Sequence, residues 1–129
     1  MYRTPALLAP LALALAASAF AAGEHDHAHE HQPLHGGVVV EVKDVDYELV
    51  ARPAAVQLHL RDHGKPADVS QASARLTLLT GTDKQEAVLR PAGGKLEAAG
   101  SFRLAPGTKA VVVVTRPGKP AATARFTLK

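Results

Sequence analysis

The fold is decided by two neighbouring stretches, Val45-Asp-Tyr-Glu-Leu-Val-Ala51 and Val56-Gln-Leu-His-Leu-Arg61. In both, every second residue is apolar: Val45, Tyr47, Leu49, Val56, Leu58 and Leu60. Because the side chains of a strand point alternately to its two faces, this period predicts two strands, each with one buried face. Arg52 and Pro53 break the pattern between them, so we expect the two strands to be neighbours in a hairpin.

The same kind of pattern recurs on both sides of this pair. Short runs separated by turn residues are expected to be strands: Val38–Val42, 72–78, Glu86–Arg90, Lys95–Ala98, Ser101–Leu104, Ala110–Arg116 and 122–128. In 72–78 and 122–128 the even-numbered residues are apolar and are expected to face the core. The valines of 111–114 predict a strand that is buried on both faces. Together these features predict an all-β domain over residues 36–129, an antiparallel β-sandwich, with a partly open barrel as the alternative.

The first 21 residues have the organisation of a secretory signal peptide. Arg3 provides a positive charge, residues 6–20 are apolar, and Ala19-Phe20-Ala21 offers small residues at a cleavage site. We expect cleavage after Ala21 and a periplasmic protein. A membrane anchor is the alternative, but the apolar run is shorter than the ~20 residues that a bilayer span needs. The processed chain is therefore not expected to be membrane-embedded.

Residues 22–35 form a histidine-rich tail that is expected to be disordered. Five of the seven histidines of the chain lie in it: His25, His27, His29, His31 and His35. Short segments of this composition bind transition metals, because neutral imidazole is their commonest side-chain ligand. The short length and Pro33 argue against a stable helix, so bound metal would have to order the tail. The alternative is a solvated tether that binds no metal.

The types of ligand restrict the metal. The chain has no cysteine, and its one methionine, Met1, would leave with the signal peptide. Imidazole and carboxylate suit Cu(II), Zn(II) or Ni(II), whereas Cu(I) prefers thiolates and thioethers. Cleavage one residue later, after Ala22, would create the N-terminus Gly23-Glu24-His25. Its free amine and third-position imidazole would chelate Cu(II) and Ni(II) in a square plane.

Two polar residues of the central strands are further candidate metal ligands. Glu48 and His59 both point away from the apolar stripe, and across a hairpin their Cβ atoms would lie about 5 Å apart. His35, at the start of the first strand, would supply the third ligand of a surface site. The alternative is that His59 is an exposed strand residue, Glu48 a solvated or ion-paired charge, and His35 a structural residue before two glycines.

Charge and composition argue against two other classes of function. Residues 36–129 contain 14 basic and nine acidic residues, but the basic residues are scattered and few aromatic residues accompany them. Nucleic acid is therefore not expected as a partner. The chain has no cysteine nucleophile, no serine in a recognisable catalytic motif and no phosphate-binding loop, so we do not expect an enzyme.

Several short motifs carry a resemblance to a known group of proteins: His35-Gly36-Gly37-Val38, Tyr47-Glu48-Leu49-Val50, Val56–Leu60 and Gly64-Lys65-Pro66. In these motifs the chain resembles small periplasmic proteins associated with bacterial heavy-metal efflux systems, and the β domain joined to some efflux adaptors. The resemblance implies an immunoglobulin-like sandwich, metal handling in the periplasm, and an efflux adaptor or another envelope protein as partner.

The expected function is therefore that of a periplasmic accessory protein that binds and buffers divalent metal, linked to heavy-metal resistance or efflux. The alternative is a β-sandwich interaction module of the cell envelope that has no metal role and recruits its partner through an exposed edge strand.

Overall fold

The computed structural model describes residues 31–129. The expected signal peptide (1–21) and residues 22–30 of the expected tail, including His25, His27 and His29, lie outside the described residues. Within residues 31–129, no helix has the length and apolar character needed to span a bilayer.

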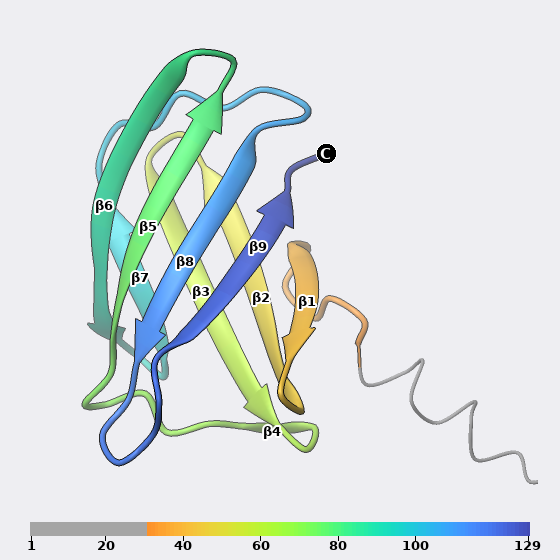
Figure 1. Ribbon diagram of the computed structural model, residues 1–129, viewed down its shortest axis with the longest axis vertical. Coiled ribbons are helices and arrows are strands. Elements are labelled where there is room, and N and C mark those ends of the chain that lie inside the picture. The colour runs from red at the N-terminus through yellow and green to blue at the C-terminus, as the bar shows by residue number, and fades with distance from the viewer. Residues whose placement is uncertain (1–30) are drawn as a thin grey trace, which may run out of the picture.

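The described residues form nine strands, and all strands that are hydrogen-bonded to each other run antiparallel. They are β1 (Val38–Val42), β2 (Val45–Arg52), β3 (Ala55–Asp62), β4 (Lys65–Pro66), β5 (Ser73–Thr80), β6 (Asp83–Ala92), β7 (Lys95–Ala99), β8 (Lys109–Thr115) and β9 (Ala122–Thr127). The pairing order is β1-β2-β3-β7-β6-β5-β8-β9, and the short β4 pairs with β3 (Figure 1).

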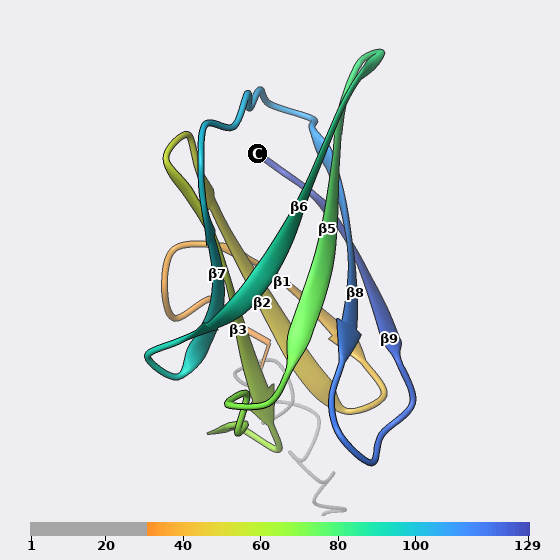
Figure 2. The same cartoon turned by 90° about the vertical axis from the view of Figure 1, so that its left-hand side faces the viewer.

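This continuous order folds into two layers. The front sheet consists of β5, β8 and β9, and the rear sheet of β1, β2, β3 and β7 (Figure 1). Strand β6 belongs to both, because its residues 83–89 pair with β5 and its residues 90–92 pair with β7; Figure 2 shows it crossing from one layer to the other. The two ends of the order, β1 and β9, contact each other. The prediction of an antiparallel, immunoglobulin-like sandwich is confirmed, with a nearly barrel-like closure.

The core lies between the two layers and follows the alternation of the sequence. In β5 the residues predicted to face inward are buried, and the same holds for Ala124, Phe126 and Leu128 around β9. Across the interior they meet Tyr47, Leu49 and Leu58 of the rear sheet. Each fully buried leucine or valine contributes about 1.5–3 kcal/mol relative to an exposed one.

The structure corrects two predicted elements. Val113, in the middle of β8, is 37% exposed, so the valine run is buried on one face only. The prediction of two buried faces is wrong because no described element covers the outer face of the front sheet there. Residues 101–104 form no strand. This segment crosses between the sheets, and its backbone is held by the Pro53 carbonyl and the Gln85 side chain instead.

A third difference concerns the two faces of β2. The alternation predicts one buried face, but residues 45–50 are buried on both. The second face is covered by residues 31–37, here called the cover segment, which make hydrogen bonds to β2 side chains. Residues 31–35, which the sequence placed in a disordered tail, are thus part of the ordered domain.

Candidate functional site

Two acidic side chains lie under the cover segment, on the outer face of β2. Asp46 is 5% exposed and Glu48 is 1% exposed. Both occupy the positions that alternate with the core residues Tyr47 and Leu49, so they point away from the core. A buried carboxylate is costly unless it is hydrogen-bonded or paired with a cation. The surroundings of these two residues therefore define the site.

Glu48 accepts four hydrogen bonds from the cover segment. Its Oε1 accepts from the backbone N–H of Leu34 at 3.0 Å and pairs with Nδ1 of His35 at 3.0 Å. Its Oε2 accepts from the backbone N–H groups of His35 at 2.8 Å and Gly37 at 3.0 Å. Burial opposes the charged form, but the hydrogen bonds from the His35 ring and the backbone outweigh it and lower the pKa of Glu48 to about 2. Glu48 thus clamps the cover segment to β2.

The glycine at the end of this clamp is required by space. A Cβ atom on residue 37 would lie 2.3 Å from the carbonyl oxygen of Leu49, so only glycine lets the chain approach β2 this closely. Gly36 has a φ of +78°, a backbone conformation that residues with side chains rarely adopt. Both glycines are thus needed for the path of the cover segment.

His59 lies opposite Glu48 in the β2–β3 register, as the hairpin prediction required. The His35 ring stacks on the His59 ring, with centroids 3.7 Å apart and an angle of 7° between the planes. Nε2 of His59 is buried and has no hydrogen-bond partner among the described residues. Burial, and then the charge of the neighbouring His35, lowers the pKa of His59 from its ordinary value of 6.5. This environment favours the neutral ring.

The structure therefore brings His35, Glu48 and His59 together. Their joint action as metal ligands stays a prediction. In this arrangement the four donors to Glu48 occupy the acceptor positions of its carboxylate, which would have to release the cover segment before it coordinated an ion. The geometry assigns this trio to holding the segment in place.

A second group lies around Asp46, two residues before Glu48 in β2, and it differs from the first. Nδ1 of His31 lies 2.8 Å from Oδ1 of Asp46, and Nε2 of His31 lies 3.0 Å from Oε2 of Glu41. The ligand atoms of the three side chains all lie within 4.8 Å of one another. One imidazole and two carboxylates are a donor set suited to divalent transition metals.

The sequence prediction included His31 but missed Glu41 and Asp46. A signal for them existed in the turn Lys43-Asp44. Both of its residues have positive φ, at 49° and 67°, which is typical of a two-residue hairpin of type I′. Such a turn fixes the register, and it places Glu41 opposite Asp46.

Arg61 of β3 joins the two groups. It is buried, and its guanidinium nitrogens lie 3.9 Å from Asp46 Oδ2 and 3.9 Å from Glu48 Oε1. Its Nη2 also donates a hydrogen bond to the backbone carbonyl of Gln32 at 2.9 Å. One cation therefore offsets two buried carboxylates and holds the backbone next to His31.

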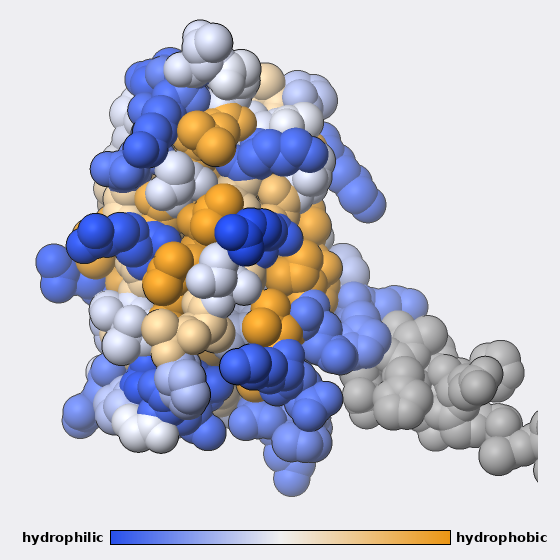
Figure 3. All heavy atoms as spheres, viewed as in Figure 1, coloured by the Kyte–Doolittle hydropathy of each residue, from blue (hydrophilic) through white to orange (hydrophobic). Residues whose placement is uncertain are grey.

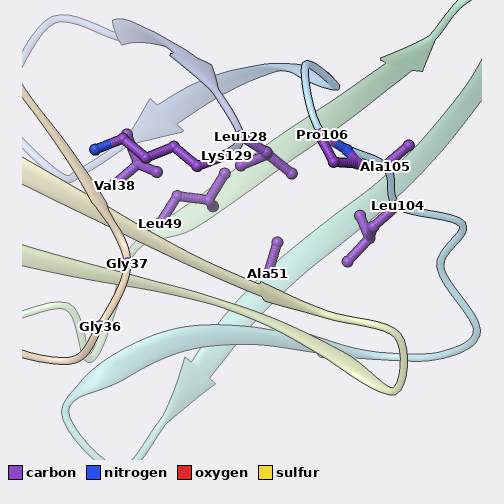
Figure 4. A pocket seen from close by; sticks show the side chains of 10 residues that line it. All are labelled: Gly36, Gly37, Val38, Leu49, Ala51, Leu104, Ala105, Pro106, Leu128 and Lys129. Carbon is purple, nitrogen blue, oxygen red and sulfur yellow. The ribbon is translucent and has the colours of Figure 1, made fainter.

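Two surface pockets lie near the site. One, of about 660 Å³, borders the stacked pair and is lined by His35, His59 and Lys95 among others. The other, of about 320 Å³, opens beside β1, and its lining includes Leu49, Leu104 and Leu128 (Figure 4). Among the side chains that line this second pocket, only that of Lys129 is ionisable, so none of them offers a carboxylate or imidazole to a metal.

Comparison with known proteins gives no family for the chain. None of the protein-family models matches the sequence, and no curated protein matches it. Among solved structures, the chain is similar to one described as "Crystal structure of Br derivative BhCBM56", with 13% identity and a TM-score of 0.41 over 71% of this chain and 99% of that one. A similarity at this level carries no inference about ligand or function.

Proposed function

We propose that this protein binds divalent transition metals in the bacterial periplasm and buffers them. The observation that carries the proposal is the position of the histidine tract. Five imidazoles lie within residues 25–35, and the first described histidine of that tract, His31, lies against two carboxylates of the domain. An imidazole of the tract thus lies beside oxygen donors of the domain.

The chemistry of these donors favours Cu(II), Zn(II) or Ni(II) as ligands. The chain offers no cysteine, so soft metals such as Cu(I) are poorly served. Affinity for such a donor set rises along the divalent series to Cu(II), and the metal bound in the cell then depends on which ions are available.

The cellular role rests on the sequence. The expected signal peptide supports export to the periplasm, and the motifs around residues 35–66 support a link to heavy-metal resistance or efflux. In this role the protein would capture ions for, or pass them to, a heavy-metal efflux adaptor or another envelope protein.

Calorimetric titration of the processed, chelator-treated chain tests the proposal. We expect at least one Cu(II), Zn(II) or Ni(II) ion to bind with a micromolar or lower Kd near neutral pH. Replacement of His25, His27 and His29 by Ala should weaken binding or reduce its stoichiometry. His63→Ala is the matched control, because it removes an exposed imidazole from a turn outside the tract. Binding by the unaltered chain that is only millimolar for all three metals would end the proposal.

One observation favours a second candidate, an interaction module without a metal role. The outer face of the front sheet exposes three large apolar side chains: Leu79, Val88 and Val113. Figure 3 shows apolar residues gathered in the middle of this face, with hydrophilic residues around and between them. An envelope protein that binds here would be captured equally well with chelator present and after His25, His27 and His29 are replaced. Val88→Lys and Val113→Lys should abolish that capture.

A further inference from the structure

We propose that the domain carries its own metal site, in which Nε2 of His31 and the carboxylate of Glu41 bind a Zn(II)-like divalent ion and Asp46 is a positioning residue. This inference deepens the proposed function, because it names the atoms of one site and assigns the tract a fixed point of attachment. It rests on the geometry of the group described above and not on the tract alone.

Asp46 fixes the orientation of the His31 ring. A carboxylate only accepts hydrogen bonds, so the 2.8 Å contact places a hydrogen on Nδ1. The other nitrogen, Nε2, then faces Glu41. Histidines that bind metal usually donate their second N–H to a carboxylate in this way, which fixes the tautomer and the ring orientation. The buried Asp46 therefore holds the ring so that Nε2 points at Glu41, where a metal ion could take the place of the hydrogen that these two groups share.

The separation of the two ligand atoms is close to what a metal needs. Nε2 of His31 and Oε2 of Glu41 lie 3.0 Å apart. With bonds of about 2.0–2.2 Å at a tetrahedral angle, a zinc ion would separate them by roughly 3.4 Å. The increase in this distance requires only a small movement of the His31 and Glu41 side chains. They are 36% and 44% exposed, so they can move without disturbing the core. An ion would take the place of the hydrogen between these atoms, and the hydrogen would leave to solvent as a proton.

The charges around the group are arranged for a cation at Glu41. Arg61 approaches Oδ2 of Asp46, whereas His31 contacts Oδ1. The positive charge of Arg61 is thus directed at the buried carboxylate, and Glu41 remains the anion on the open side. The same arginine holds the Gln32 carbonyl, so the backbone is anchored immediately after His31.

The site is incomplete with two protein ligands. A zinc ion that is held by His31 and Glu41 has two of its four positions left. Water would complete the coordination. We expect the first and tightest metal ion to bind at the domain site. Further ions would bind more weakly to the other histidines of the tract.

Zn(II) titration of single-site variants of the processed chain tests this inference. Glu41→Gln should weaken the tightest Zn(II) step at least tenfold, because it removes a ligand at a side chain that is partly exposed and lies outside the core. Glu86→Gln, an exposed carboxylate on β6, is the matched control and should leave every step unchanged. Asp46→Asn should weaken the same step by about 10–100-fold, the usual effect of losing a residue that orients a ligand. Urea unfolding without metal shows whether each variant is folded.

Nitrogen NMR of the His31 ring separates positioning from mere structural support. On addition of Zn(II), we expect the Nε2 resonance to shift while Nδ1 keeps its hydrogen. A shift at Nδ1 instead would overturn the role of Asp46. A loss of less than tenfold in Glu41→Gln, while replacement of His25, His27 and His29 abolishes binding, would overturn the domain site and leave the proposed function standing. Failure of the unaltered chain to bind Zn(II), Cu(II) or Ni(II) would overturn both.

Discussion

Strand β2 carries two acidic residues, each paired with a histidine of the cover segment, and the two pairs differ in what surrounds the carboxylate. Glu48 receives the His35 ring and three backbone N–H groups, so its acceptor positions are filled by the chain itself. Asp46 receives the His31 ring, whose second nitrogen meets an exposed carboxylate, Glu41. The first pair is closed and serves stability, whereas the second is open on one side and has the form of a ligand site.

This comparison shows why residue types alone did not separate structure from function. Both pairs consist of a histidine of the cover segment and an acidic residue of β2. What distinguishes them is the number of backbone donors that converge on the carboxylate. That number depends on the path of residues 34–37, which Gly36 and Gly37 make possible.

Removal of the charge at Glu48 should have the largest effect on stability. Glu48→Gln places an amide N–H against N–H donors and leaves Arg61 with less compensation, so we expect the free energy of unfolding to fall by about 3 kcal/mol. Glu41→Gln, the corresponding change in the open pair, should alter it by less than about 0.5 kcal/mol because the side chain is 44% exposed and outside the core. Urea unfolding at neutral pH without metal measures both. Equal losses in the two variants would contradict the distinction between a closed and an open pair.

The second prediction sharpens the comparison through pH. The pKa of Glu48 is lowered from 4.5 to about 2 in the folded chain, so the unfolded chain takes up this proton first as the pH falls. The contribution of Glu48 is therefore fully present above pH 4.5 and is lost as the pH falls towards 2. A shift of this size corresponds to roughly 3 kcal/mol.

Urea unfolding between pH 6 and pH 2 should show this loss in the unaltered chain. Glu48→Gln provides the control, since it cannot titrate at this position and should lose much less stability over the same range. If both proteins weakened in parallel below pH 4.5, acid lability would have to come from other carboxylates.

Much of the fold could be predicted because its determinants are local. The alternation of apolar residues gave the faces of β2, β3, β5 and β9, and the two-residue turn after β1 fixes a register that brings Glu41 opposite Asp46. The pairing of Glu48 with His59 followed from the same reasoning. These contacts depend on neighbours in the chain, so a sequence contains the information directly.

The cover segment could not be predicted in this way. Residues 31–37 have no apolar period, and they are held by backbone N–H groups, which every non-proline residue carries. The indication that residues 31–37 pack against the domain lies instead in β2, a strand rich in apolar residues that also contains two acidic residues. Once buried, such residues need donors, and here the donors came from the segment read as a tail.

The smallest expected effect concerns His59. Its ring stacks on His35 of the closed pair, and it makes none of the hydrogen bonds described for Glu48. Its pKa is lowered by burial, then by His35, so the unfolded chain takes up this proton first. Stability should therefore be fully present above pH 6.5 and decline as the pH falls through the lower pKa of the folded chain. Proton NMR of the His59 ring should give a titration midpoint below 6.5. His59→Phe keeps an aromatic ring for stacking on His35 but cannot titrate, so it should retain more stability than the unaltered chain between pH 7 and pH 5. A midpoint at or above 6.5 would mean that the ring accepts a proton without cost, and that the closed pair is more open to water than its contacts imply.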